Sequence, residues 1–181
     1  MRIRNDAGLK SVVGATFGPD VRQNADGSPK KHQGWDLYAP VGTPVYAISD
    51  GFIVWTRDEG DYGKQILLSF NIAGAENVSD SNTRYAFYAH LSEISVAGSF
   101  VRGGSEIGKT GTSGNASAAY PHLHFEVRTS ADKWLAGLNG RVNPGELLGY
   151  QHLSCTAKEI AGVETVQLVC PARLGPSEIS R

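Results

Sequence analysis

One stretch in the second half of the chain, PHLHFEVRT at residues 121–129, limits the fold more than any other. Its residues alternate between apolar and ionisable with a period of two, which is typical of a β-strand with one buried face. The apolar face should pack on the core and carries Leu123, Phe125 and Val127. The opposite face should point into a groove and carries His122, His124 and Glu126.

Other short β-type runs, separated by turns, lie before this stretch. GKQILLSFNI (63–72) and RYAFYAHLS (84–92) are rich in the β-branched and aromatic residues that favour strands. Two further runs lie within TPVYAISDGFIVWT (43–56), and the Ser49-Asp50-Gly51 segment between them is a hairpin signal.

Helical signals are sparse. No segment before residue 130 has an apolar period of 3.6 residues with caps, and NPGELLGY (143–150) fits one short helical turn. The sequence therefore predicts a mainly β protein. We expect an antiparallel β-sheet core with long loops walling a groove and few short helices.

The chain divides into three parts, an arm at 1–16, a domain at 17–150 and an extension at 151–181. Its two cysteines, Cys155 and Cys170, both lie in the extension and are too few for a Cys-based zinc knuckle. Two interpretations stay open: two reduced thiols, or a disulfide that staples a C-terminal hairpin and contributes about 3 kcal/mol. His152 fits no motif and is interpreted as a surface residue.

Charge and hydropathy argue against two classes of partner. The 181 residues carry a net charge of −1, and no basic run indicates nucleic acid or an anionic membrane surface. No apolar run approaches the roughly 20 residues that span a bilayer, so we expect no membrane span. The first ten residues lack the apolar core of a secretory signal, so no signal peptide is visible.

Four of the five histidines lie at expected strand ends or beside glycine-rich turns. His32 and Asp36 are four residues apart in a turn that runs into a strand, His90 follows an aromatic run, and His122 and His124 form His-x-His. Each pattern alone is weak, because most such histidines are solvated or packed. Together they suit a zinc centre of three protein ligands and a water, with two histidines left for proton chemistry.

The order of these patterns resembles the lysostaphin/LytM-type zinc metallopeptidases, peptidase family M23. The resemblance covers about Phe17 to Leu147. It rests on HQGWDLYAPVGTPVYAISDGFIV, YAHLS, VRGGSEIGKTGTSG and PHLHFEVR, with RVNPGELL as the usual close of the domain. The resemblance identifies residues 17–150 as an M23-like zinc peptidase domain, with a small antiparallel β core and a substrate groove walled by loops.

Carried over to this chain, the resemblance implies that one Zn²⁺ is bound by His32, Asp36 and His124. It implies likewise that His90 and His122 flank the bound water as the catalytic pair, and which of the two is the base stays open. The implied activity is zinc-dependent endopeptidase hydrolysis of peptide bonds in bacterial peptidoglycan, and we expect D,D-cross-links as its target. The alternative is a non-catalytic, LytM-like cell-wall binding or activator module, a role that members take when ligands are lost.

Two departures from the family pattern bear on bond specificity. Tyr120 stands where a glycine is usual, and the polar loop at 73–83 is sizeable.

A third interpretation of the chain is a biotinyl- or lipoyl-carrier-like domain modified at Lys109 in GKTG. This interpretation leaves every histidine unexplained.

The implied substrate also indicates where in or outside the cell the protein acts. Peptidoglycan lies in the periplasm or outside the cell, so without a visible leader we expect export by a specialised route. One route is that of an interbacterial toxin effector, whose immunity protein would occupy the groove. The others are a phage lysis or tail component and a shortened form of an ordinary cell-wall hydrolase.

Overall fold

The computed structural model describes residues 3–4, 15–72, 81–96, 98–132, 134–147, 158–160 and 163–166. The first seven strands are β1 (Ile3–Arg4), β2 (Gly18–Gln23), β3 (Pro29–His32), β4 (Trp35–Tyr38), β5 (Pro44–Tyr46), β6 (Gly51–Glu59) and β7 (Gly63–Asn71). The remaining elements are β8 (Thr83–Ile94), β9 (Phe100–Val101), β10 (Glu106–Thr110), β11 (His122–Arg128), β12 (Arg141–Val142), the short helix α1 (Pro144–Leu147), β13 (Lys158–Ile160) and β14 (Val163–Val166).

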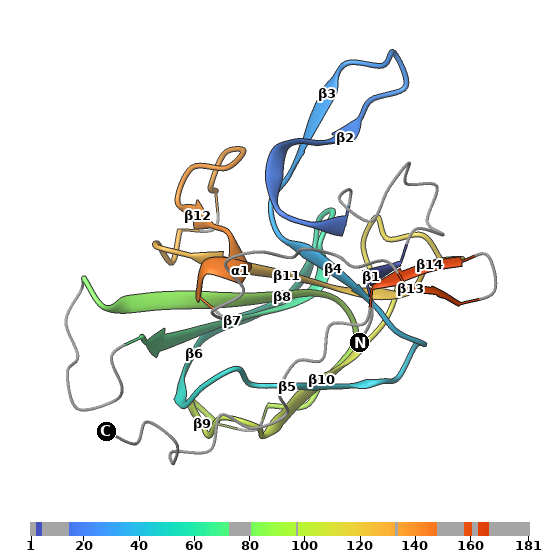
Figure 1. The fold of residues 1–181 in the computed structure, drawn as a ribbon. Coiled ribbons are helices and arrows are strands. Elements are labelled where there is room, and N and C mark those ends of the chain that lie inside the picture. The colour runs from blue at the N-terminus through green and yellow to red at the C-terminus, as the bar shows by residue number, and fades with distance from the viewer. Residues whose placement is uncertain are drawn as a thin grey trace, which may run out of the picture.

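A nine-stranded antiparallel sheet forms the body of the protein (Figure 1). Its continuous path runs in the order β12-β11-β8-β7-β6-β9, while β4 pairs with β11 and β10 joins both β5 and β8. The predicted mainly β fold with an antiparallel core is confirmed, and the expected helical turn in NPGELLGY is α1.

Two smaller sheets complete the described structure. The hairpin β2–β3 stands away from the main sheet, in blue at the top of Figure 1. The backbone of β14 pairs with both β1 and β13. Cys155, Cys170 and His152 lie outside the described residues, so the disulfide and the domain boundaries stay predictions.

The expected hairpin at Ser49-Asp50-Gly51 is wrong. Strand β5 pairs with β10, and β6 pairs with β7 and β9, so the chain crosses between β5 and β6 instead of folding back. The Asp50 carboxylate accepts a hydrogen bond from the backbone N–H of Gly103, 2.7 Å away. This contact ties the turn to the β9–β10 connection, and a local turn signal cannot contain such a partner.

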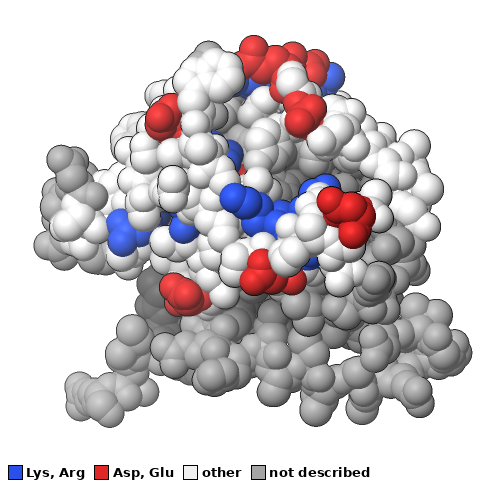
Figure 2. All heavy atoms as spheres, turned by 90° about the horizontal axis from the view of Figure 1, so that it is seen from above, with Lys and Arg blue, Asp and Glu red and all other residues white. Residues whose placement is uncertain are grey.

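The main sheet carries a large apolar cluster on one face and a small one on the other. Leu123, Phe125 and Val127 pack in the large cluster, as the alternation of β11 predicts. The opposite face of β11 is more deeply buried than expected, since His122 is 8% exposed and Glu126 is fully buried. Figure 2 shows acidic and basic side chains interspersed over the surface that is seen from above. In the residues that the structure describes, no helix is long and apolar enough to cross a membrane.

Candidate metal centre

The connection between β3 and β4 brings two polar side chains onto β11. His32 ends β3 and Asp36 lies in β4, where it pairs directly with His124 of β11. Gly34 lies between them, and a Cβ at this position would be 2.3 Å from the carbonyl oxygen of Phe125. Only glycine allows this close approach, so the turn depends on it.

Three donor atoms of His32, Asp36 and His124 form a buried triangle. His32 Nε2 lies 3.2 Å from Asp36 Oδ1 and 3.2 Å from His124 Nδ1, and His124 Nδ1 lies 2.9 Å from Asp36 Oδ1. Tetrahedral zinc with bonds of about 2.0–2.2 Å separates its ligand atoms by about 3.3–3.6 Å. The triangle matches this spacing to within a few tenths of an ångström, so its size and its N/N/O donor set fit such an ion.

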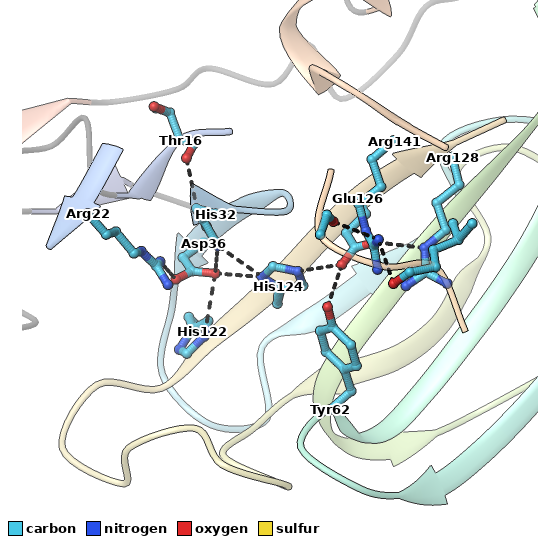
Figure 3. Close-up of polar contacts among 12 residues, drawn as sticks. Thr16, Arg22, His32, Asp36, Tyr62, His122, His124, Glu126, Arg128 and Arg141 are labelled. Carbon is cyan, nitrogen blue, oxygen red and sulfur yellow. Dashed lines mark hydrogen bonds and ion pairs between the residues drawn. The ribbon is translucent and has the colours of Figure 1, made fainter. Parts of the chain in front are cut away.

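Hydrogen bonds on the far side of each imidazole decide which nitrogen offers a lone pair (Figure 3). His32 donates its Nδ1–H to the carbonyl oxygen of Thr16 at 2.9 Å, and His124 donates its Nε2–H to Glu126 Oε1 at 3.0 Å. Carbonyl and carboxylate oxygens can only accept, so each bonded nitrogen carries the proton. The nitrogens left to offer lone pairs to an ion are therefore His32 Nε2 and His124 Nδ1, which both face Asp36 Oδ1. Without an ion, a proton on either nitrogen is donated to that carboxylate oxygen instead.

The electrostatics of the triangle favour a positive charge within it. Burial lowers the pKa of His32, against the opposing effect of Asp36, and so favours the neutral imidazole that binds metals. Burial alone would raise the pKa of Asp36, but hydrogen bonds from His124 and His32 hold it well below its usual range. For His124, burial is likewise outweighed, and hydrogen bonds to Asp36 and Glu126 raise its pKa to about 9.

Arg22 of β2 also touches the triangle. Its guanidinium forms an ion pair with Oδ2 of Asp36, while Oδ1 of the same carboxylate contacts the two imidazoles. Arg22 was not among the residues singled out from the sequence. No spacing rule indicates the contact, because the β2–β3 hairpin carries Arg22 back over a separation of 14 residues.

The other two predicted site histidines border the triangle. His122 donates its Nδ1–H to the carbonyl oxygen of Tyr120 at 2.8 Å, and its Nε2 lies 3.7 Å from Asp36 Oδ1. His90 donates its Nδ1–H to the carbonyl oxygen of Ser113 at 2.9 Å, and its ring centroid lies 4.9 Å from that of His122. Burial lowers the pKa of His90 to about 4, with help from its neighbouring imidazoles, so this ring is neutral near pH 7.

His90 reaches this position through an unusual backbone conformation. It lies inside β8 rather than at the strand's end, and its φ of 60° is left-handed. Tyr88 packs in the large cluster and Ala89 in the small one, so strict alternation would send His90 to the large cluster. Instead Leu91 packs there, and the left-handed residue lets His90 lie beside His122. Such a conformation costs about 1–2 kcal/mol and is often found at functional sites.

All five side chains singled out from the sequence thus lie together in the structure. Sequence reasoning missed Arg22, the role of Glu126, and Tyr62, whose hydroxyl donates a hydrogen bond to Glu126 Oε1 at 2.8 Å. The alternation in β11 was the one available signal, since it put Glu126 on the same face as the two histidines.

The site combines three converging donors with a second pair of imidazoles beside them. Metal-dependent hydrolases use sites of this kind. On an antiparallel sheet such a site fits a metallopeptidase domain. The model described as peptidase family M23 matches residues 30–144, and the chain belongs to this family.

The chain is similar to several curated proteins. It is 40% identical over 97 residues to the DD-carboxypeptidase/endopeptidase Mpg of Neisseria meningitidis, covering 54% of this chain and 20% of that protein. It is 32% identical over 148 residues to the peptidoglycan DD-endopeptidase ShyC of Vibrio cholerae, covering 81% and 30%. For the glycyl-glycine endopeptidase ALE-1 of Staphylococcus capitis the identity is 39% over 104 residues, covering 55% and 25%. The chain thus spans less than a third of the length of these relatives.

Solved structures share the fold. The catalytic domain of lysostaphin from Staphylococcus simulans is 29% identical with a TM-score of 0.55, covering 74% of this chain and 89% of that one. A zinc containing peptidase from Vibrio cholerae is 27% identical with a TM-score of 0.54, covering 77% and 37%.

Proposed function

We propose that this protein is a zinc-dependent endopeptidase that hydrolyses peptide bonds of bacterial peptidoglycan. One Zn²⁺ would be held by His32, Asp36 and His124. The observation that carries the proposal is the buried triangle of donor atoms, 2.9–3.2 Å apart. The substrate class is supported by the names of relatives that are peptidoglycan endopeptidases.

A bound Zn²⁺ would supply a Lewis acid that lowers the pKa of a water ligand to about 7 and polarises a carbonyl. The two further imidazoles handle the proton. Both have their Nδ1–H tied to a carbonyl oxygen, so each offers a lone pair at Nε2. His122, whose Nε2 faces the triangle, takes a proton from the attacking water and passes it to the leaving amine. His90, which stays neutral near pH 7, orients the water by accepting a hydrogen bond.

The test combines zinc content with hydrolysis of purified cell wall. The purified protein should contain about one zinc per chain and release soluble fragments from peptidoglycan. A protein without zinc and without wall-clearing activity contradicts the enzyme. A protein that holds zinc but hydrolyses no wall peptide supports the alternative, a non-catalytic cell-wall binding or activator module.

The bond we propose is the D,D-cross-link between D-alanine and meso-diaminopimelate. Its support is that the relatives Mpg and ShyC are both named as DD-peptidases. ALE-1, named as a glycyl-glycine endopeptidase, is the competing precedent. Mass analysis of fragments released from defined muropeptides decides between them, because cleavage at glycyl bridges and cleavage at D,D-cross-links leave products of different mass.

We further propose that the protein acts in the periplasm or outside the cell, as an exported antibacterial effector with an immunity protein that covers the site. The location follows from the proposed substrate, which lies outside the cytoplasmic membrane. Expression in a bacterium with and without a periplasmic leader tests it. Killing only with the leader supports a wall target, and equal killing from the cytoplasm contradicts it.

A further inference from the structure

Glu126 of β11 is a fully buried carboxylate with four partners, two from its own strand and two from more distant parts of the chain (Figure 3). Its Oε1 lies 3.0 Å from Nε2 of His124 and accepts a hydrogen bond from the hydroxyl of Tyr62 at 2.8 Å. Its Oε2 accepts from Nε of Arg128 at 2.6 Å and from Nε of Arg141 at 2.7 Å. The two oxygens thus have different tasks, since Oε1 contacts the candidate ligand and Oε2 contacts two cations.

This arrangement is costly to bury. Both guanidinium side chains are at most 3% exposed, so three charged groups have left water together. Well-packed apolar residues of similar volume would often serve stability equally well or better than a buried ion network. Stability alone therefore does not explain this buried ion network. The network contacts the candidate metal ligands at His124.

The two arginines are themselves held in place. Arg141 donates from Nη1 to the carbonyl oxygens of Leu135 at 3.1 Å and Gly137 at 2.9 Å. The guanidinium of Arg128 lies 3.7 Å from the centroid of the Phe87 ring, at cation–π distance. Because both cations are fixed, Oε2 is fixed, and the carboxylate cannot rotate away from His124 without breaking two charge-assisted hydrogen bonds.

We propose that Glu126 is a positioning residue of the metal centre, which holds the His124 ring and its tautomer so that Nδ1 faces the ion. The inference rests on the proposed zinc site. The two arginines hold the carboxylate and offset its charge, so Glu126 orients His124 without making the centre more anionic.

His124 differs in this respect from the other three site histidines. His32, His90 and His122 each donate Nδ1–H to a backbone carbonyl oxygen, which no substitution of a side chain can remove directly. The orientation of His124 depends on a side chain and can therefore be tested. Loss of such an outer partner of a metal-bound histidine typically weakens metal binding about 10- to 100-fold.

The experiment measures zinc affinity by competition with a chromophoric chelator. The proteins are wild type, Glu126→Gln, Glu126→Ala and the control Tyr88→Phe, which removes a buried hydroxyl from the opposite face of the sheet. We expect zinc affinity to fall about tenfold in Glu126→Gln, which keeps an acceptor oxygen, and about 100-fold in Glu126→Ala. Tyr88→Phe should lower thermal stability with zinc affinity unchanged.

A second readout separates positioning from stability. The visible absorption of the Co²⁺-substituted protein reports ligand geometry, and it should shift in both Glu126 variants but not in Tyr88→Phe. If the Glu126 variants do not fold, Tyr62→Phe replaces them, because it removes one hydrogen bond to Oε1 without changing charge. It should weaken zinc binding and shift the same spectrum, by less than the Glu126 changes.

The outcomes distinguish this inference from the proposed function. A wild type that binds zinc together with folded variants of wild-type affinity and spectrum overturns the role of Glu126 and leaves the metal site standing. A wild type that binds no zinc overturns the metal site and the positioning role together.

Discussion

His122 and His124 lie two residues apart on one face of β11, yet their surroundings differ. His124 has Asp36 on one side and Glu126 on the other, at 2.9 and 3.0 Å. His122 donates a hydrogen bond from Nδ1 to the backbone carbonyl of Tyr120, and its Nε2 lies 3.7 Å from Asp36 Oδ1. At the residue scale these contacts suit a metal ligand and a proton carrier respectively.

The first prediction separates these two roles. His124→Ala should lose zinc and wall hydrolysis together, because it removes one of three donors. His122→Ala should keep most of its zinc and lose turnover by about 100- to 10,000-fold, the usual contribution of a general acid–base group. Metal analysis and muropeptide hydrolysis on the same samples check both. A His122→Ala protein with wild-type turnover removes His122 from the mechanism.

The second prediction concerns the left-handed backbone at His90. Both His90→Gly and His90→Ala remove the imidazole, and both should lose activity. Their stabilities should differ, because glycine adopts a φ of 60° without the clash that alanine suffers. We expect His90→Gly to unfold at higher denaturant, with an advantage of about 1 kcal/mol over His90→Ala. Equal midpoints would mean that the left-handed conformation is relaxed in the variants.

At the scale of elements, β11 organises the site. It pairs with β4, β8 and β12, and so brings Asp36 directly opposite His124. The connection from β3 to β4 must run close against β11 for this pairing to form. Gly34 is the residue that permits it.

The third prediction tests this connection. Gly34→Ala would place a Cβ 2.3 Å from a backbone carbonyl oxygen of β11, so β4 must shift. We expect a loss of about 1–3 kcal/mol in the free energy of unfolding, the usual range for overpacking, together with weakened zinc binding. Gly98→Ala is the matched control, since that glycine is exposed, has no positive φ, as Gly34 has none, and has nothing within 4 Å of its Cβ position. Unchanged zinc affinity in Gly34→Ala would contradict a dependence of the site on this approach.

At the scale of the whole molecule, the five site residues come from four strands, β3, β4, β8 and β11. They meet only in the folded chain, so an ion bound there stabilises the fold by mass action. The same reasoning makes folding a requirement for high-affinity metal binding.

The fourth prediction is that chelation lowers the melting temperature. At zinc concentrations about 1,000-fold above the dissociation constant, binding adds about 4 kcal/mol, which for a chain of this size is roughly 10 °C. Calorimetry with a chelator, and then with zinc or magnesium added back, measures it. Zinc should restore the melting temperature and magnesium should not, because magnesium prefers all-oxygen ligands. A melting temperature insensitive to chelation would argue against a metal in the triangle.

Local sequence pattern was sufficient for the β architecture and for the two sides of β11. Alternation is a local property of the backbone, so the sequence alone assigns Leu123 and Phe125 to the core and His124 to the opposite face. The family resemblance then singled out side chains that are up to 92 residues apart in the chain and in contact in the fold.

Only the tertiary structure shows which other groups contact those side chains. The pairing of β5 with β10, the reach of Arg22 from its hairpin and the left-handed turn at His90 all involve partners distant in sequence. The same holds for two partners of the Glu126 carboxylate, Tyr62 and Arg141, whereas Arg128 lies two residues along β11 on the face that alternation predicts. The physical reason is that period and propensity act over a few residues, whereas a buried charge takes its partners from whichever strands packing brings to it.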